Sequence, residues 1–111
     1  GQMALRLAIE QPRAVRGVAA VVAAMAASSE CREPRRAVNV LFISGTADTV
    51  LPYGGGAVQV GRVPRGSALS AERSVEIWAA LARARPVGME EQLPDLDPGD
   101  GSRVTRVTHA G

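Results

Sequence analysis

The segment that most constrains the fold is residues 37–44, whose sequence is AVNVLFIS. It is almost continuously apolar and rich in β-branched residues, a pattern typical of a strand buried on both faces, and Gly45 ends it. Residues 15–22 form a second, shorter run with the same Val-rich character. Because such strands occur in sheets covered by helices, the two runs predict an α/β fold with a mostly parallel sheet.

Helices are predicted on either side of these strands. Residues 2–10 combine Ala, Leu, Met, Arg and Glu, which are good helix formers, and Pro12 ends that segment. Ser70 suits the N-cap of a second helix over residues 71–85, with Glu72 favourable in its first turn. The predicted order is helix, strand, loop, strand, long loop, helix, loop, strand, which indicates an α/β sheet.

The remaining segments are expected to be irregular or exposed. Residues 28–36 form a polar loop, and residues 46–66, with two prolines and five glycines, predict a long irregular loop of the kind that often carries function. Residues 90–101 predict a solvated acidic turn. Residues 102–108 alternate Val with polar residues, a pattern that indicates an exposed or edge strand.

Composition excludes several functional classes. All 13 basic residues are Arg, the net charge is only +2, and the one cluster, Arg32, Arg35 and Arg36, is interpreted as part of a solvated loop, so no nucleic-acid interface is expected. The apolar run 17–27 is about half the roughly 20 residues that a membrane-spanning helix needs. Cys31 is the only cysteine, which rules out an internal disulfide, and one His and one Cys cannot form a zinc site.

Asp48 is the candidate catalytic residue. It lies in the segment Gly45-Thr46-Ala47-Asp48, just past the carboxyl end of the strongest predicted strand, where ligands bind in open α/β sheets. A carboxylate there can accept the N–H of a catalytic imidazole, fix its tautomer and stabilise the imidazolium. An Asp in a loop also often caps a turn through its own backbone, and position alone favours that simpler role.

Residues 39–55, NVLFISGTADTVLPYGG, resemble the segment around the triad acid in esterases of the polyhydroxybutyrate depolymerase and feruloyl esterase-like family. That family has a strand, then Gly-Thr-x-Asp, then Val-x-Pro-Tyr and glycines; this chain departs from it at Ser44, where the family usually has His. Three further segments resemble the same family. Residues 1–8 resemble the helix after the nucleophile elbow, and residues 69–78 resemble the helix after the acid loop. Residues 93–104 resemble the turn and strand that lead toward the catalytic His.

The resemblance implies that residues 1–111 are a partial domain, the C-terminal half of an α/β-hydrolase fold. This partial domain begins just after the nucleophile elbow and ends before the catalytic His. Asp48 would be the triad acid. His109, the only His, follows Asp48 in the correct order, but it falls where the family often has an aromatic residue and is not assigned as catalytic.

The implied activity of the intact parent is hydrolysis of hydroxyalkanoate oligoesters or feruloyl-type esters, with no metal and no organic cofactor. The parent would bind a small or oligomeric ester substrate, and it would not bind nucleic acid or a membrane. Its location would be extracellular or periplasmic. The chain alone is expected to be inactive. Two alternatives stay open: a catalytically inactive truncated fragment, and an unrelated α/β small-molecule-binding module that completes its fold within 111 residues.

Overall fold

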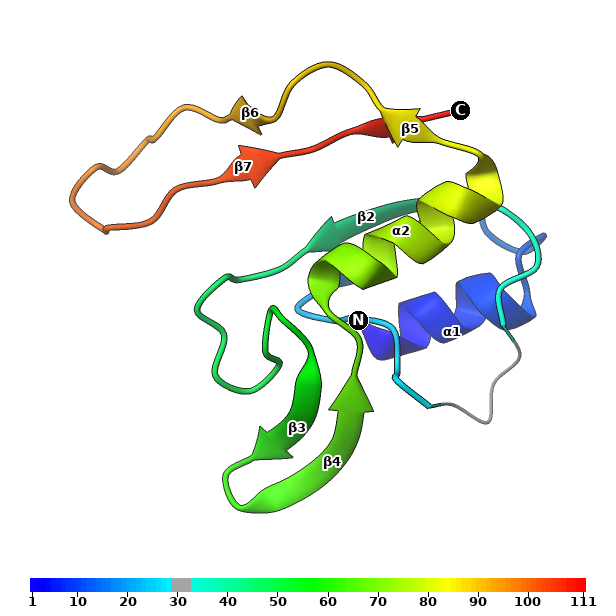
Figure 1. Ribbon diagram of the computed structural model, residues 1–111, viewed down its shortest axis with the longest axis horizontal. Helices are drawn as coiled ribbons and strands as arrows, with labels where there is room; N and C mark the ends of the chain where they lie inside the picture. Colours follow the sequence, from blue (N-terminus) through cyan, green and yellow to red (C-terminus); the bar gives the residue numbers. More distant parts are fainter. Residues whose placement is uncertain (29–32) are drawn as a thin grey trace.

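The structure of the chain is a computed structural model that describes residues 1–28 and 33–111 (Figure 1). Cys31 and Arg32 lie outside the described residues. The elements in chain order are α1 (Gln2–Glu10), β1 (Gly17–Val21), β2 (Asn39–Ile43), β3 (Gly56–Val60), β4 (Val63–Ala68), α2 (Ala71–Ala82), β5 (Arg85–Pro86), β6 (Glu91–Gln92), β7 (Thr105–Arg106) and β8 (His109–Ala110).

The predicted parallel strands are confirmed. β1 and β2 pair in parallel with a continuous register from Gly17 opposite Asn39 to Val21 opposite Ile43. The helices α1 and α2 both pack on one face of this pair, and together they bury a core made by Leu5, Ala8, Ala20, Ala23 and Trp78.

The prediction that these strands are buried on both faces is wrong for the described residues. Side chains alternate between the two faces of a strand, and both helices lie on the same face. Leu41 and Ile43 therefore point away from the helices and remain 57% and 49% exposed.

Both predicted helices are confirmed, and one of them is shorter than expected. Ser70 caps α2, because its Oγ accepts the backbone N–H of Arg73 at 3.0 Å. The helix ends at Ala82 and not at residue 85, because Arg83 adopts a left-handed conformation with φ 53° and Arg85 joins strand β5. Within the described ranges, no helix is long and apolar enough to cross a membrane.

The prediction of an irregular loop over residues 46–66 is wrong for its second half. Strands β3 and β4 form an antiparallel hairpin that projects from the helices and the β1–β2 pair (Figure 1). Val60 pairs with Val63 across a two-residue turn, and Gly61 occupies its first position with φ 63°. Such a turn favours glycine, and Pro64 is tolerated because a two-stranded hairpin consists of edge strands.

The C-terminal segment forms a ribbon of short antiparallel pairs, β5 with β8 and β6 with β7 (Figure 1). The single strand predicted over residues 102–108 is therefore divided, although its exposure is as predicted. Arg106 and Glu91 form an ion pair of 2.6 Å across the ribbon. The acidic turn lies at the end of this ribbon. In it, the carboxylates of Asp95, Asp97 and Asp100 each accept the backbone N–H of the residue two positions later.

Candidate active site

Asp48 lies at the carboxyl edge of the parallel pair, as the sequence predicts. The two strands end together there, because the backbone N–H of Val22 donates to the carbonyl of Ile43 at 2.8 Å. The Asp48 side chain is half-buried and borders a cavity of about 10 Å³ beside Ser44 and Ala71. A cavity of this size is at the lower limit for a single water molecule.

One oxygen of the Asp48 carboxylate is held by the backbone. Oδ1 accepts the N–H groups of Val50 and Leu51, each at 2.8 Å. Asp48 therefore does cap a turn. The same contacts also fix the orientation of the carboxylate, and within the described part of the chain Oδ2 has no hydrogen-bond partner. Because a carboxylate has two acceptor oxygens, capping through Oδ1 is compatible with accepting an imidazole N–H through Oδ2.

The loop after Asp48 is anchored to the beginning of α2. The backbone N–H of Ala71 donates to the carbonyl of Tyr53 at 2.9 Å, and Gly55 closes a turn by donating to the carbonyl of Pro52 at 2.9 Å. The sequence did not reveal this anchoring. It was hidden because Ala71 and Tyr53 are far apart in sequence and only their backbone groups interact.

A buried serine ties the segment after β1 to the same helix. Ser74 is fully buried; its Oγ accepts the N–H of Met25 at 2.9 Å and donates to the carbonyl of Ser70 at 2.9 Å. The N–H of Leu69 in turn donates to the Met25 carbonyl at 2.8 Å. These hydrogen bonds connect Met25, in the segment after β1, to the N-terminus of α2, next to the Asp48 loop.

The start of α1 lies at the same edge of the sheet. A Cβ built on Gly1 would collide with the Cβ of Ala23 and lie 2.8 Å from the carbonyl oxygen of Val21. Glycine at this position therefore allows the first residues of α1 to pack closely on the end of β1, at the same edge of the sheet as Asp48.

The structure does not bring His109 to Asp48. His109 pairs with Pro86 across the β5–β8 ribbon and borders a hollow that also contains Asn39, at the start of β2, and Ala82, at the end of α2. Asp48 follows the end of β2 and lies beside the beginning of α2. Because α2 has 12 residues, its two ends are about 18 Å apart.

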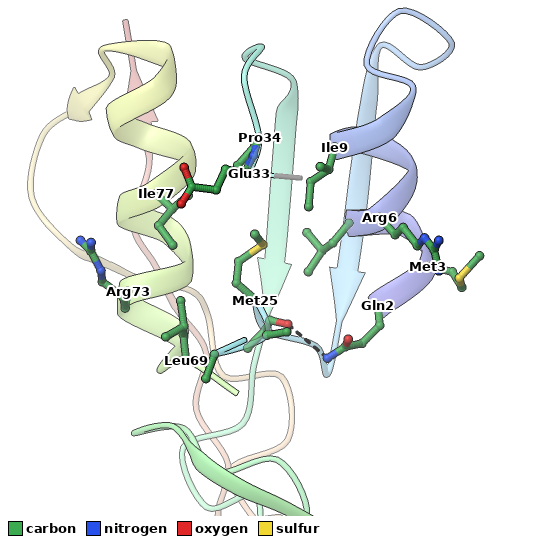
Figure 2. Close-up of a pocket in the computed structure, with 14 residues that line it drawn as sticks. Gln2, Met3, Arg6, Ile9, Met25, Glu33, Pro34, Leu69, Arg73 and Ile77 are labelled. Atoms are coloured by element: carbon green, nitrogen blue, oxygen red, sulfur yellow. Dashed lines mark hydrogen bonds between the residues drawn. The ribbon is translucent and has the colours of Figure 1, made fainter. Parts of the chain in front are cut away.

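A groove between α1 and α2 has a volume of about 660 Å³. Figure 2 shows Ile9 of α1 and Ile77 of α2 on its two walls, with Met25 between them. Gln2 closes one end by donating to the carbonyl of Ala24 at 3.3 Å. The groove is mostly apolar and does not contain Asp48.

Comparison with known proteins relates the chain to an esterase. The chain is 32% identical, over 99% of its length, to a protein described as "Putative esterase NocK" from Nocardia uniformis subsp. tsuyamanensis. The chain covers 33% of that relative, and so spans about a third of its length. No protein-family model matches the chain, and no solved structure matches it.

Proposed function

We propose that the chain is part of a longer serine carboxylic-ester hydrolase with an α/β-hydrolase fold, in which Asp48 is the triad acid. Two findings support this: the similarity to an esterase about three times as long, and the placement of Asp48 at the carboxyl edge of two parallel strands. The observation that carries the proposal is the Asp48 carboxylate, with Oδ1 fixed by two backbone amides and Oδ2 available as an acceptor.

In this proposal Oδ2 of Asp48 accepts the N–H of a catalytic His and holds the ring in the tautomer that can act as a base. The His and the nucleophilic Ser come from other parts of the longer protein. The nucleophile would precede Gly1, since α1 begins at the same edge and a nucleophile elbow connects a strand to such a helix.

The reaction proceeds in two halves. The Ser oxygen attacks the acyl carbon while the His takes its proton, and the His then protonates the departing alcohol. Water, deprotonated by the same His, then attacks the acyl carbon, and the His returns that proton to the Ser oxygen as the acyl–oxygen bond breaks and the acid is released. The Asp48 carboxylate stabilises the imidazolium, and this chemistry requires neither a metal nor an organic cofactor.

The resemblance around Asp48 extends the proposal to substrate and location. Hydroxyalkanoate oligoesters or feruloyl-type esters are the proposed substrates, and an extracellular or periplasmic location is proposed on the same basis. Both substrate classes present an ester carbonyl that the Ser can attack, with the His as the base and Asp48 orienting that His.

The test compares hydrolysis of p-nitrophenyl butyrate by this chain and by the longer protein that contains it. The longer protein should turn over the ester, and this chain should stay at the background rate. Turnover by this chain alone would contradict the assignment of the nucleophile to another segment, and no turnover by the longer protein would contradict the esterase proposal.

The groove between α1 and α2 favours a second candidate, a small-molecule-binding module. Its volume of about 660 Å³ falls within the range of about 300–1,000 Å³ typical of ligand pockets, and its walls are mostly apolar, with Gln2, Arg6, Glu33 and Arg73 also lining it. Binding of the fluorescent probe 1-anilinonaphthalene-8-sulfonate to this chain, lost in Ile77→Arg and kept in Ala80→Arg, an exposed position of α2 outside the groove, would support it. Absence of saturable binding would exclude it.

A further inference from the structure

At Gly55 the turn after Asp48 closely approaches the backbone of residues 68–70, which runs from the end of β4 to the N-cap of α2. Gly55 has φ +82°, and a Cβ built on it would lie 2.7 Å from the backbone N of Ser70, 3.0 Å from the carbonyl O of Ala68 and 3.0 Å from the carbonyl C of Leu69. All three atoms belong to the main chain and cannot move aside by a side-chain rotation. Only glycine therefore lets this turn lie against the start of the helix.

The close approach fixes the same loop that holds the carboxylate. Gly55 closes the turn by donating to Pro52, and Tyr53, inside that turn, accepts the N–H of Ala71. The amide of Leu51, which donates to Asp48 Oδ1 at 2.8 Å, belongs to the residue directly before Pro52. Displacement of the turn would therefore move a donor that orients the carboxylate.

We propose that Gly55 is a positioning residue for the Asp48 carboxylate. Its contact with Ser70 seats residues 52–55 on the N-terminus of α2, and this sets the direction in which Oδ2 points. The inference rests on the proposed function, because the direction of Oδ2 matters only if Oδ2 accepts the N–H of a catalytic imidazole. Gly55 itself touches no reacting atom.

The neighbouring glycines supply matched controls. Among the described residues, no atom lies within 4 Å of a Cβ built on Gly54, and its φ is not positive, so Gly54→Ala adds the same methyl group without collision or strain. Gly56 has φ +116°, and a Cβ built on it likewise meets no atom of the described residues within 4 Å. Gly56→Ala therefore introduces backbone strain without the collision, which separates the two effects of Gly55→Ala.

The first experiment uses this chain and measures backbone amide resonances by two-dimensional NMR. Gly55→Ala should shift the amide signals of Val50 and Leu51 and speed their hydrogen exchange, because their acceptor geometry changes. Gly54→Ala should leave both signals in place, and Gly56→Ala should shift them less than Gly55→Ala does. Unchanged signals in a folded Gly55→Ala chain would overturn the proposal.

A second variant applies if Gly55→Ala does not fold. Ala71→Pro removes the N–H that donates to Tyr53, at the first helical position where proline is tolerated. The preceding Ser70 has ψ 157°, which is compatible with a following proline. The α2 circular dichroism signal should persist while the amide signals of Val50 and Leu51 shift. A persistent circular dichroism signal together with unshifted amide signals would overturn the proposal.

The second experiment measures kcat and KM for the longer protein that contains this chain. Gly55→Ala should lower kcat by roughly 10²-fold, the scale of an ångström-sized misplacement, with KM within about twofold. If Asp48→Asn lowers kcat and Gly55→Ala does not, the positioning role is wrong and the proposed function stands. If Asp48→Asn has no effect, the proposed function fails, and the NMR result alone decides whether Gly55 sets the carboxylate geometry.

Discussion

Replacement of Ser74 by Ala should destabilise the junction that supports the Asp48 loop. Ser74 is fully buried, and its Oγ is the acceptor for the N–H of Met25 at 2.9 Å. The same hydroxyl donates to the Ser70 carbonyl at 2.9 Å. Ala removes the hydroxyl with little change in volume, so the effect isolates these hydrogen bonds.

The magnitude follows from which groups lose their partners. The Ser70 carbonyl keeps the backbone N–H of residue 74, which donates to it at 3.0 Å. The Met25 N–H has no substitute acceptor among the described residues, and an unsatisfied, partly buried donor costs about 1–3 kcal/mol. A loss of about 2 kcal/mol lowers the Tm of a domain of this size by about 10 °C.

Urea unfolding followed by the fluorescence of Trp78 measures this change, with the m-value expected to stay constant. The control is Ser67→Ala, at an exposed serine on β4, which should change the free energy of unfolding by less than about 0.5 kcal/mol. Equal stability of the Ser74→Ala and Ser67→Ala chains would refute the role assigned to the buried hydroxyl.

Two further predictions concern the helix cap and the acidic turn. Ser70→Ala should lower the free energy of unfolding by about 1 kcal/mol, because it removes the side-chain acceptor for the Arg73 N–H; no change in urea midpoint would contradict this. The Ser102 backbone N–H, then its side chain, lower the pKa of Asp100 below 3.8. Ionised Asp100 therefore favours the folded turn above pH 3.8, and the contribution fades as pH falls through the lowered pKa; a carbon-detected NMR titration with a midpoint at or above 3.8 would be inconsistent with this.

The elements with a local signal were predictable from the sequence. Residues 2–10 contain helix formers followed by Pro12, and residues 40–43 are continuously apolar, so each pattern identifies its own conformation. The β3–β4 hairpin was missed because its three glycines and Pro64 give it the composition of a loop. One local clue was present, since Gly61 lies at the turn between two valine-containing segments.

The candidate site was predictable in position but not in geometry. Asp48 follows the strongest strand, so its place at the carboxyl edge could be inferred from order alone. The sequence could not show that Oδ1 accepts two backbone N–H groups while Oδ2 does not, because this depends on where the amides of Val50 and Leu51 point. The need for glycine at position 55 arises only when the turn meets Ser70 in three dimensions.

The most direct test of Asp48 as the triad acid is kcat for Asp48→Asn in the longer protein of which this chain is proposed to be a part. The Asn carbonyl can still accept the amides of Val50 and Leu51, so the turn is preserved while the negative charge is removed. As the triad acid, Asp48 should be essential for kcat, with a loss of about 10⁴-fold and an unchanged fold. A kcat equal to that of the unaltered protein would contradict this account and leave Asp48 as a residue that only caps its turn.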